Sequence, residues 1–200
     1  MIVNAMRLIR AALERYIQEF EQESPGEEPP RVVINNIALA KKLGGDDEDI
    51  QGVIMSLVNL QEEATLKNVP HYRLDNGRSI YQNPPVHLNL FILFSVLDSN
   101  YQFAIKLLSR VVEFFQIQKE LSFTSTPPQN LAAVGGSIIP QEVKIVADLY
   151  SLTFEQLNHL WGALGGKQVP FVLYRVRLVA VQGQKRQAEG EVITEIFINE

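Results

Sequence analysis

The chain has 200 residues, of which 46% are hydrophobic and 20% charged, so it is long and apolar enough to bury one sizeable core. Its net charge of −5 argues against a protein that binds nucleic-acid phosphates, which normally needs a basic surface. The sequence contains no cysteine, which excludes disulfides, thiolate metal sites and cysteine nucleophiles.

Residues 1–20 are predicted to form an amphipathic helix. Arginine and glutamate interrupt the segment, so it reads neither as a signal peptide nor as a membrane span. A helix on a membrane surface is the alternative, but the acidic segment 19–30 that follows would be repelled by anionic lipid. This favours packing on a sheet. The apolar positions recur every three or four residues: Ile2, Ala5, Met6, Ile9, Leu13, Tyr16, Ile17 and Phe20.

The next segments alternate between loops and strands. Residues 24–30 contain Pro, Gly and Glu and predict an exposed linker. Residues 31–39 are β-branched and predict a strand, and residues 53–66 predict a second, longer one. The acidic run within residues 41–50 lacks the spaced ligands of a calcium loop, so a solvated loop is predicted there.

Residues 68–85 are rich in turn formers, and the Asp-Asn-Gly sequence at 75–77 predicts a hairpin tip, because Asn-Gly readily adopts positive φ angles. Residues 86–97 predict a central strand. One of its faces is apolar throughout, whereas the other begins polar with His87 and Asn89 and then becomes apolar.

Residues 100–118 predict a helix with Asp98 or Ser99 as its N-cap. Residues 121–142 hold two prolines in a row and two glycines, and predict an irregular loop that is flexible or orders against a partner. The predicted apolar stripe of the helix is Tyr101, Ala104, Ile105, Leu108, Val111, Val112 and Phe115.

Residues 144–150 alternate and predict a strand. A short helix follows, with Thr153 and Gln156 at the spacing of a capping box and Gly165 at its end. We expect Trp161 to belong to the core rather than to a binding hot spot, because it lies within the apolar stripe. That stripe is Leu157, Leu160, Trp161 and Leu164.

Residues 171–181 predict a strand with a core face and a basic, half-exposed face that carries Arg175 and Arg177. These arginines are predicted to contact acidic patches on a neighbouring protein, and the alternative is the solvated face of an edge strand. Residues 191–199 predict a last strand, a natural donor for pairing with an exposed sheet edge. Its interface candidates are Val192, Ile196 and Ile198, and the core face of 171–181 is Val172, Tyr174, Val176, Leu178 and Ala180.

No catalytic or metal site is predicted. The three histidines, His71, His87 and His159, lie in separate elements without metal-ligand spacing, and the glycine doublets do not form a phosphate-binding loop. No cofactor is expected. The pattern as a whole predicts an α+β fold: a single domain over residues 1–200, with a mixed or mostly antiparallel sheet covered by about three helices.

Four stretches together carry a family resemblance: NLQEEATLKN, PPVHLNLFILFSVL, NYQFAIKLLSRVVEFFQ and the L-W-G-A-L-G…P…Y-R-V-R unit. In this order, the sequence resembles the tail-terminator, or cap, family of extracellular contractile injection systems. These are the phage-tail-like particles of the antifeeding prophage and Photorhabdus virulence cassette type. The resemblance covers about residues 1–182. One departure is Phe171, where the resemblance leads us to expect a small serine.

The resemblance implies a structural, non-enzymatic protein made in the cytoplasm and built into a particle that can be released. It implies a homohexameric ring on the distal end of the inner tube and sheath, which stops polymerisation and anchors the last sheath layer. The implied partners are further copies of the chain, the sheath protein, the inner tube protein and a tape-measure protein, with neither nucleic acid nor membrane. A monomeric protein- or peptide-binding module is the alternative, and an unrecognised enzyme is a third.

Overall fold

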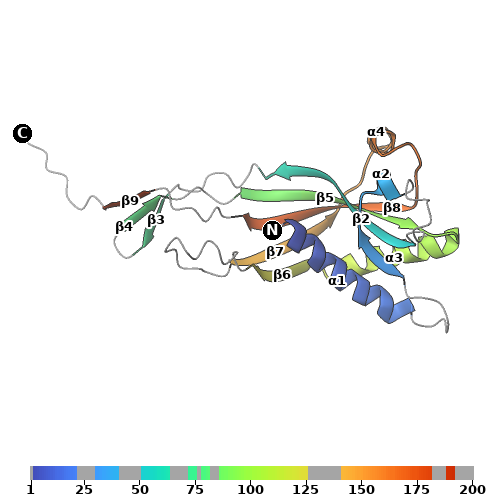
Figure 1. Ribbon diagram of the computed structural model, residues 1–200, viewed down its shortest axis with the longest axis horizontal. Helices are drawn as coiled ribbons and strands as arrows, with labels where there is room; N and C mark the ends of the chain where they lie inside the picture. The colour runs from blue at the N-terminus through green and yellow to red at the C-terminus, as the bar shows by residue number, and fades with distance from the viewer. Residues whose placement is uncertain are drawn as a thin grey trace, which may run out of the picture.

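The computed structural model describes residues 2–21, 30–40, 51–63, 72–75, 78–81, 86–125, 141–181 and 188–191. Within these ranges the chain forms a six-stranded sheet with helices against it, and a separate three-stranded sheet (Figure 1). The elements in chain order are α1 (Ile2–Glu21), β1 (Arg31–Ile34), α2 (Ile37–Ala40), β2 (Gly52–Glu62), β3 (Tyr72–Asp75), β4 (Arg78–Tyr81), β5 (Val86–Leu97), α3 (Tyr101–Ile117), β6 (Glu120–Ser125), β7 (Gln141–Leu149), α4 (Phe154–Ala163), β8 (Phe171–Val181) and β9 (Ala188–Glu191).

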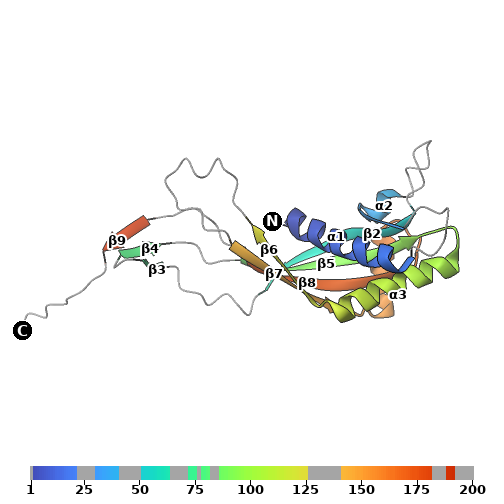
Figure 2. The same ribbon diagram turned by 90° about the horizontal axis from the view of Figure 1, so that it is seen from below.

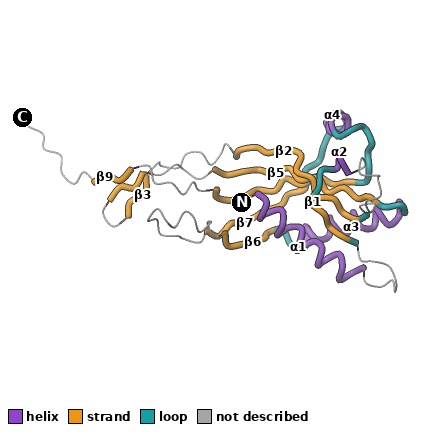
Figure 3. Tube along the Cα trace, in the orientation of Figure 1, coloured by secondary structure: helices purple, strands orange, loops and turns teal. Residues whose placement is uncertain are grey.

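The large sheet has the strand order β1-β2-β5-β8-β7-β6. The β1–β2 pair is parallel, and every other neighbouring pair is antiparallel. Figure 3 shows the strands as one layer with helices beside it. The predicted α+β class and the mixed, mostly antiparallel sheet are therefore confirmed. β5 lies between β2 and β8, as its apolar sequence predicted.

The small sheet has the order β3-β4-β9. Asp75 pairs with Arg78 across β3 and β4, which confirms the hairpin predicted at 75–77. β9 pairs antiparallel with β4. Figures 1 and 2 both show this sheet beyond one end of the large sheet, away from α3. Of the strand predicted at 191–199, the described part reaches Glu191, so Val192, Ile196 and Ile198 lie outside the described residues.

One face of the large sheet packs against α1 and α3 (Figure 2). We call it the helix-covered face. The predicted stripe of α1 is largely confirmed, because Ala5, Ile9, Leu13 and Ile17 are fully buried there. Alternate side chains of the strands point to the helix-covered face, as a pleated sheet requires. These strand residues are Val32, Val53, Met55, Leu90, Ile92, Phe94, Val96, Leu121, Ile145, Ala147, Tyr174 and Val176.

The N-cap of α3 differs from the prediction. The cap is Asn100, whose side-chain oxygen accepts hydrogen bonds from the backbone N–H groups of Gln102 (3.0 Å) and Phe103 (3.3 Å). Asp98 instead accepts from the N–H of Asn100 at 2.7 Å. Asp98 thus orders the residue that caps the helix, and a sequence with three potential caps in a row does not say which one is used.

The buried stripe of α3 is also rotated from the prediction. Tyr101 and Ile105 were expected inside, but their exposed fractions are 67% and 41%. The helix carries apolar residues on more than one face. The face that packs against the sheet is the one that contains the Phe114 and Phe115 rings. The buried residues are Ala104, Leu107, Val111, Phe114 and Phe115.

The opposite face of the sheet is covered by α2 and α4 in part, and we call it the α4 face. α4 begins with the predicted capping box, in which Thr153 and Gln156 each accept a backbone N–H from the other. It ends at two glycines with φ of 101° and 76°, where the N–H of Gly166 donates to the carbonyl of Trp161 at 2.7 Å. This closure is the Schellman motif. The buried cluster beneath is Ile37, Ile54, Phe91, Leu93, Trp161 and Leu173.

Two predicted boundaries are wrong. The strand expected at 31–39 ends at Ile34, and α2 follows, because Ser56 Oγ donates to the carbonyl of Asn35 (2.6 Å) and accepts from the N–H of Ile37 (3.0 Å). The loop expected at 121–142 begins and ends in strand, since β6 runs to Ser125 and β7 starts at Gln141. Pairing between β6 and β7 overrides the polar sequence there.

Candidate functional surface

The candidate surface lies on the α4 face where α4 no longer covers the sheet. The register places Arg175 directly opposite Asp148 on β7 and opposite Phe91 on β5. Arg177, two residues further along β8, lies opposite Asn89. Strand alternation therefore brings these side chains to one side of three neighbouring strands.

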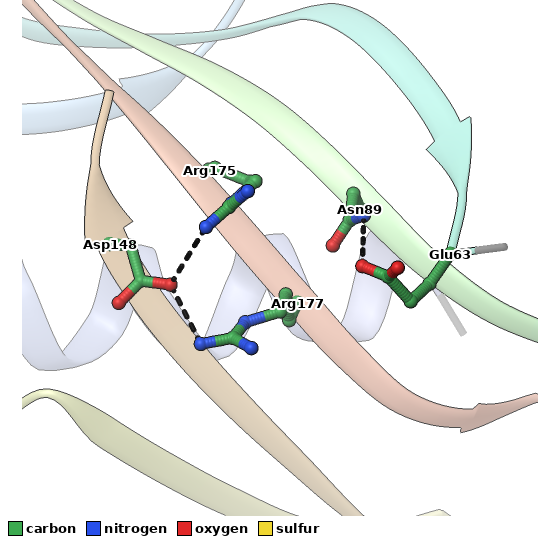
Figure 4. A network of polar contacts seen from close by, with 5 residues as sticks. All are labelled: Glu63, Asn89, Asp148, Arg175 and Arg177. Carbon is green, nitrogen blue, oxygen red and sulfur yellow. Dashed lines mark hydrogen bonds and ion pairs between the residues drawn. The ribbon is translucent and has the colours of Figure 1, made fainter. Parts of the chain in front are cut away.

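A single carboxylate serves both arginines. Asp148 Oδ2 accepts from Arg177 Nη2 at 2.8 Å and lies 3.5 Å from Arg175 Nη2 (Figure 4). The side chains are half-exposed, with exposed fractions of 39% for Asp148 and Arg175 and 46% for Arg177. The carboxylate partner expected on a neighbouring protein is thus present within the chain, and two guanidinium groups share it.

A second polar pair lies next to the arginines. Asn89 Nδ2 donates to Glu63 Oε2 at 2.9 Å, with Glu63 just beyond the end of β2 (Figure 4). Asn89 is 7% exposed, and its Oδ1 has no hydrogen-bond partner among the described residues. The Nε atom of Arg175 is likewise buried and has no acceptor in the part of the chain that the structure describes. Buried polar atoms in this state are uncommon in proteins, so this surface has spare hydrogen-bonding capacity.

Aromatic side chains border the polar residues. The Phe91 ring meets the Tyr150 ring edge-on at a centroid distance of 5.1 Å. Trp161 is 5% exposed and packs against Phe171 at 5.3 Å, so the prediction that Trp161 belongs to the core is confirmed. Phe171, in place of the expected serine, is accommodated by this contact. The surface therefore has an apolar border beside charged groups.

The arginines do not lie on an edge strand. β8 is between β5 and β7, so the edge-strand part of that alternative is wrong. The solvated part is not, because both arginine side chains are half-exposed. The arginine-bearing face of β8 is also less exposed than predicted, because Leu173 on that face is buried under α4. Sequence reasoning missed Asp148, Asn89 and Glu63, since a cross-strand partner depends on register, which the sequence pattern of one strand does not give.

The described residues offer little for catalysis. His87 lies half-buried on β5 and His159 is exposed on α4, while His71 lies outside the described residues. Over the same part of the chain, no three metal-binding side chains of the His, Cys, Asp or Glu type gather at one place. None of the helices described is both long and apolar enough to span a membrane.

The comparisons with known proteins agree with the fold. The model of the Pvc16 N-terminal domain family matches residues 6–195. The chain belongs to this family. Its resemblance to terminators of contractile injection systems, first seen in the sequence motifs, is thereby confirmed. Among curated proteins, none matches the sequence.

Two solved structures share the fold of this Pvc16-family chain. The sheath/tube terminator of an extracellular contractile injection system, PVC, in its extended state has a TM-score of 0.62 at 15% identity. The tube-terminating cap of the anti-feeding prophage has a TM-score of 0.60 at 13% identity. Each match covers 100% of this chain and 63% or 62% of the other. The chain thus spans about three fifths of the length of these terminators, and the likeness shows the fold.

Proposed function

We propose that the chain is the terminating cap of a contractile injection system, a structural component of a phage-tail-like particle and not an enzyme. The observation that carries this proposal is the family match over residues 6–195, nearly the whole chain. The shared fold of the two terminators supports it. In this role the cap binds the distal end of the inner tube and sheath, stops their polymerisation and anchors the last sheath layer.

The cap is proposed to act as a homohexameric ring, with the sheath protein, the inner tube protein and a tape-measure protein as its other partners. A closed ring of identical subunits needs two different, complementary surfaces on each copy. We assign Arg175 and Arg177, with the polar side chains around them, to one of the contacts with a neighbour. The segment 191–199, with Val192, Ile196 and Ile198, is a second candidate contact.

Deletion of the gene from a producing strain tests the cap role. We expect particles with irregular or unstable ends, because nothing would seal the growing tube and sheath. Restoring the gene on a plasmid is the control. Uniform, contractile particles of normal length in the deletion strain would overturn the proposal. Mass measurement and negative-stain imaging then separate a ring-forming cap from a monomeric binding module.

Neutralising the arginine pair tests the assigned contact. Arg175→Gln with Arg177→Gln keeps hydrogen-bonding side chains but removes both charges. Because the pair is half-exposed, the free energy of unfolding should fall by no more than about 1 kcal/mol. A partly buried charged contact with a neighbour would lose about 2–5 kcal/mol of binding. We therefore expect a nearly normal melting temperature but poor incorporation into particles.

The matched control is Arg7→Gln with Arg10→Gln, which removes the same charge from exposed positions on α1. Incorporation at the wild-type level by the Arg175/Arg177 variant would show that these arginines are ordinary surface residues. Equal loss by both variants would point to net charge rather than to this contact.

A further inference from the structure

The large sheet ends in two edges that pair with no further strand among the described residues. β1 pairs with β2 from Gly52 to Met55, and beyond this point β2 continues to Glu62 with β5 on one side. At the opposite end of the sheet, β6 pairs with β7 on one side. The two edges are segment 57–62 of β2 and the whole of β6 (Glu120–Ser125). Sheet edges of this kind are templates for another strand.

The β2 edge is exposed and carries apolar side chains. Leu57 and Leu60 are 40% and 46% exposed, although their register with β5 places them on the helix-covered side of the sheet. The N–H of Leu60 donates to the side chain of the preceding Asn59 at 2.8 Å, so a side chain here serves a backbone donor. Neither edge contains Lys or Pro, the residues that most often protect an edge from pairing, although a bulge lies between Leu57 and Asn59.

The two edges are compatible in direction and in side-chain orientation. Four antiparallel steps separate β2 from β6, so the two strands run in the same direction. In a head-to-tail ring whose axis lies roughly along the strands, β6 of one copy therefore meets β2 of the next as a parallel strand. Asn59 and Ser122 both lie on the α4 side of the sheet by register, which allows them to face each other.

The two edges also match in length. Both edge segments are about six residues long, the usual length of a strand.

We propose that segment 57–62 of one copy pairs in parallel with β6 of a second copy, so that the sheet continues from subunit to subunit. The inference rests on the proposed ring and names the surfaces that close it. Its partner is another molecule of this chain. Backbone hydrogen bonds along the new pair supply the attraction, and the exposed leucines of β2 are covered in the process.

The absence of cysteine from the chain makes a direct test available. Asn59→Cys with Ser122→Cys introduces one thiol at each edge. Within one copy these positions are four strands apart, about 19 Å, whereas a disulfide needs Cα atoms within about 7 Å. A disulfide therefore reports contact between copies. Particles assembled with the double variant are oxidised and their caps are analysed on non-reducing gels.

We expect a ladder of covalent oligomers that ends at the closed ring and disappears on reduction. A second pair, Gln61→Cys with Ser122→Cys, covers a register shifted by two residues. Leu60→Cys with Ser122→Cys is the matched control, because Leu60 lies on the other side of the sheet and should not cross-link. The two single variants control for random oxidation.

Monomeric caps after oxidation of both test pairs, in particles that are capped normally, would overturn the edge pairing and leave the cap role intact. A chain that is missing from purified wild-type particles would overturn the cap role instead. If a double variant fails to enter particles, Asn59→Lys decides the matter. A lysine at a used edge should reduce incorporation at an unchanged melting temperature, and full incorporation would overturn the proposal.

Discussion

The two faces of the large sheet differ in what they bury. The helix-covered face is built from aliphatic and aromatic side chains, and the buried Tyr174 is packed among rings. The α4 face also has an apolar cluster, but the buried polar residues of the described part, Ser56, Asn89 and Ser95, lie on it. Asn89, Ser95, Trp161 and Arg175 each have a buried side-chain atom on this side that finds no hydrogen-bond partner among the described residues.

This difference indicates a division of roles. Apolar burial stabilises by about 25 cal/mol for each Å² removed from water, and a dry face without polar groups gains most from it. A buried polar atom without a partner costs free energy, so a face that keeps several such atoms is poorly suited to stability alone. The helix-covered face therefore holds the fold together, and the α4 face is the one that we propose contacts other molecules.

The largest effect should come from a cavity under α3. Phe114 is 2% exposed, and its ring contacts those of Tyr16 and Phe115. Phe114→Ala should lower the free energy of unfolding by about 3–5 kcal/mol. Phe154→Ala is the matched control on α4, at a side chain that is 91% exposed, and it should change stability by no more than about 0.5 kcal/mol. Similar losses for both, measured by urea denaturation, would contradict the division between the faces.

The second-largest loss of stability is expected at Gly52, a backbone position in the sheet that both faces share. Gly52 begins β2 at a φ of 115°, and a Cβ there would collide with the backbone carbonyl oxygen of Arg31 on β1. Gly52→Ala should destabilise the protein by about 2–4 kcal/mol through strain and displacement of β1. At Gly162 in α4, an added Cβ meets nothing within 4 Å. Gly162→Ala should therefore stabilise by about 0.5–1 kcal/mol, and thermal melts of both variants test the contrast.

A moderate effect is expected at the start of α4. Thr153→Ala removes the oxygen that accepts the N–H of Gln156 and opens the capping box. The expected loss is about 1 kcal/mol. Thr153→Ser keeps the oxygen and should restore most of it. If the capping box stabilises only the α4 face, amide hydrogen exchange in the Thr153→Ala variant should become faster in α4 and remain slow in α1. Equal increases in both helices would show that the faces unfold as one unit.

The last effect is limited to alkaline pH and concerns the helix-covered face. Burial raises the pKa of Tyr174 above its usual value of 10.0. In the unfolded chain the phenol ionises first, so the folded state binds more protons above about pH 10 and the free energy of unfolding falls there. The fall is at most about 1.4 kcal/mol per pH unit. Tyr174→Phe should remove this part of the alkaline loss, and parallel curves for variant and wild type would contradict the assignment.

Local signals made several elements predictable from sequence. The period of α1 identified Ile9, Leu13 and Ile17 as buried, and the spacing of Thr153 and Gln156 identified the capping box. The two-sided apolar pattern of 86–97 identified a central strand. Each depends on residues close together in the chain. α3 was harder, because its apolar residues fit two stripes and the facing sheet decided between them.

The sequence by itself determined the α+β class, most strands and helices, the apolar core positions and the family resemblance, because periodicity and capping are local properties. Tertiary structure alone decided the order of the strands. That order gave Arg175 and Arg177 a shared carboxylate from Asp148, 27 residues before Arg175 in the chain, and placed β8 inside the sheet. Among the described strands, it also left segment 57–62 and β6 as edges of the large sheet. The physical reason is that cross-strand register follows from how all the faces pack together, and no single segment encodes it.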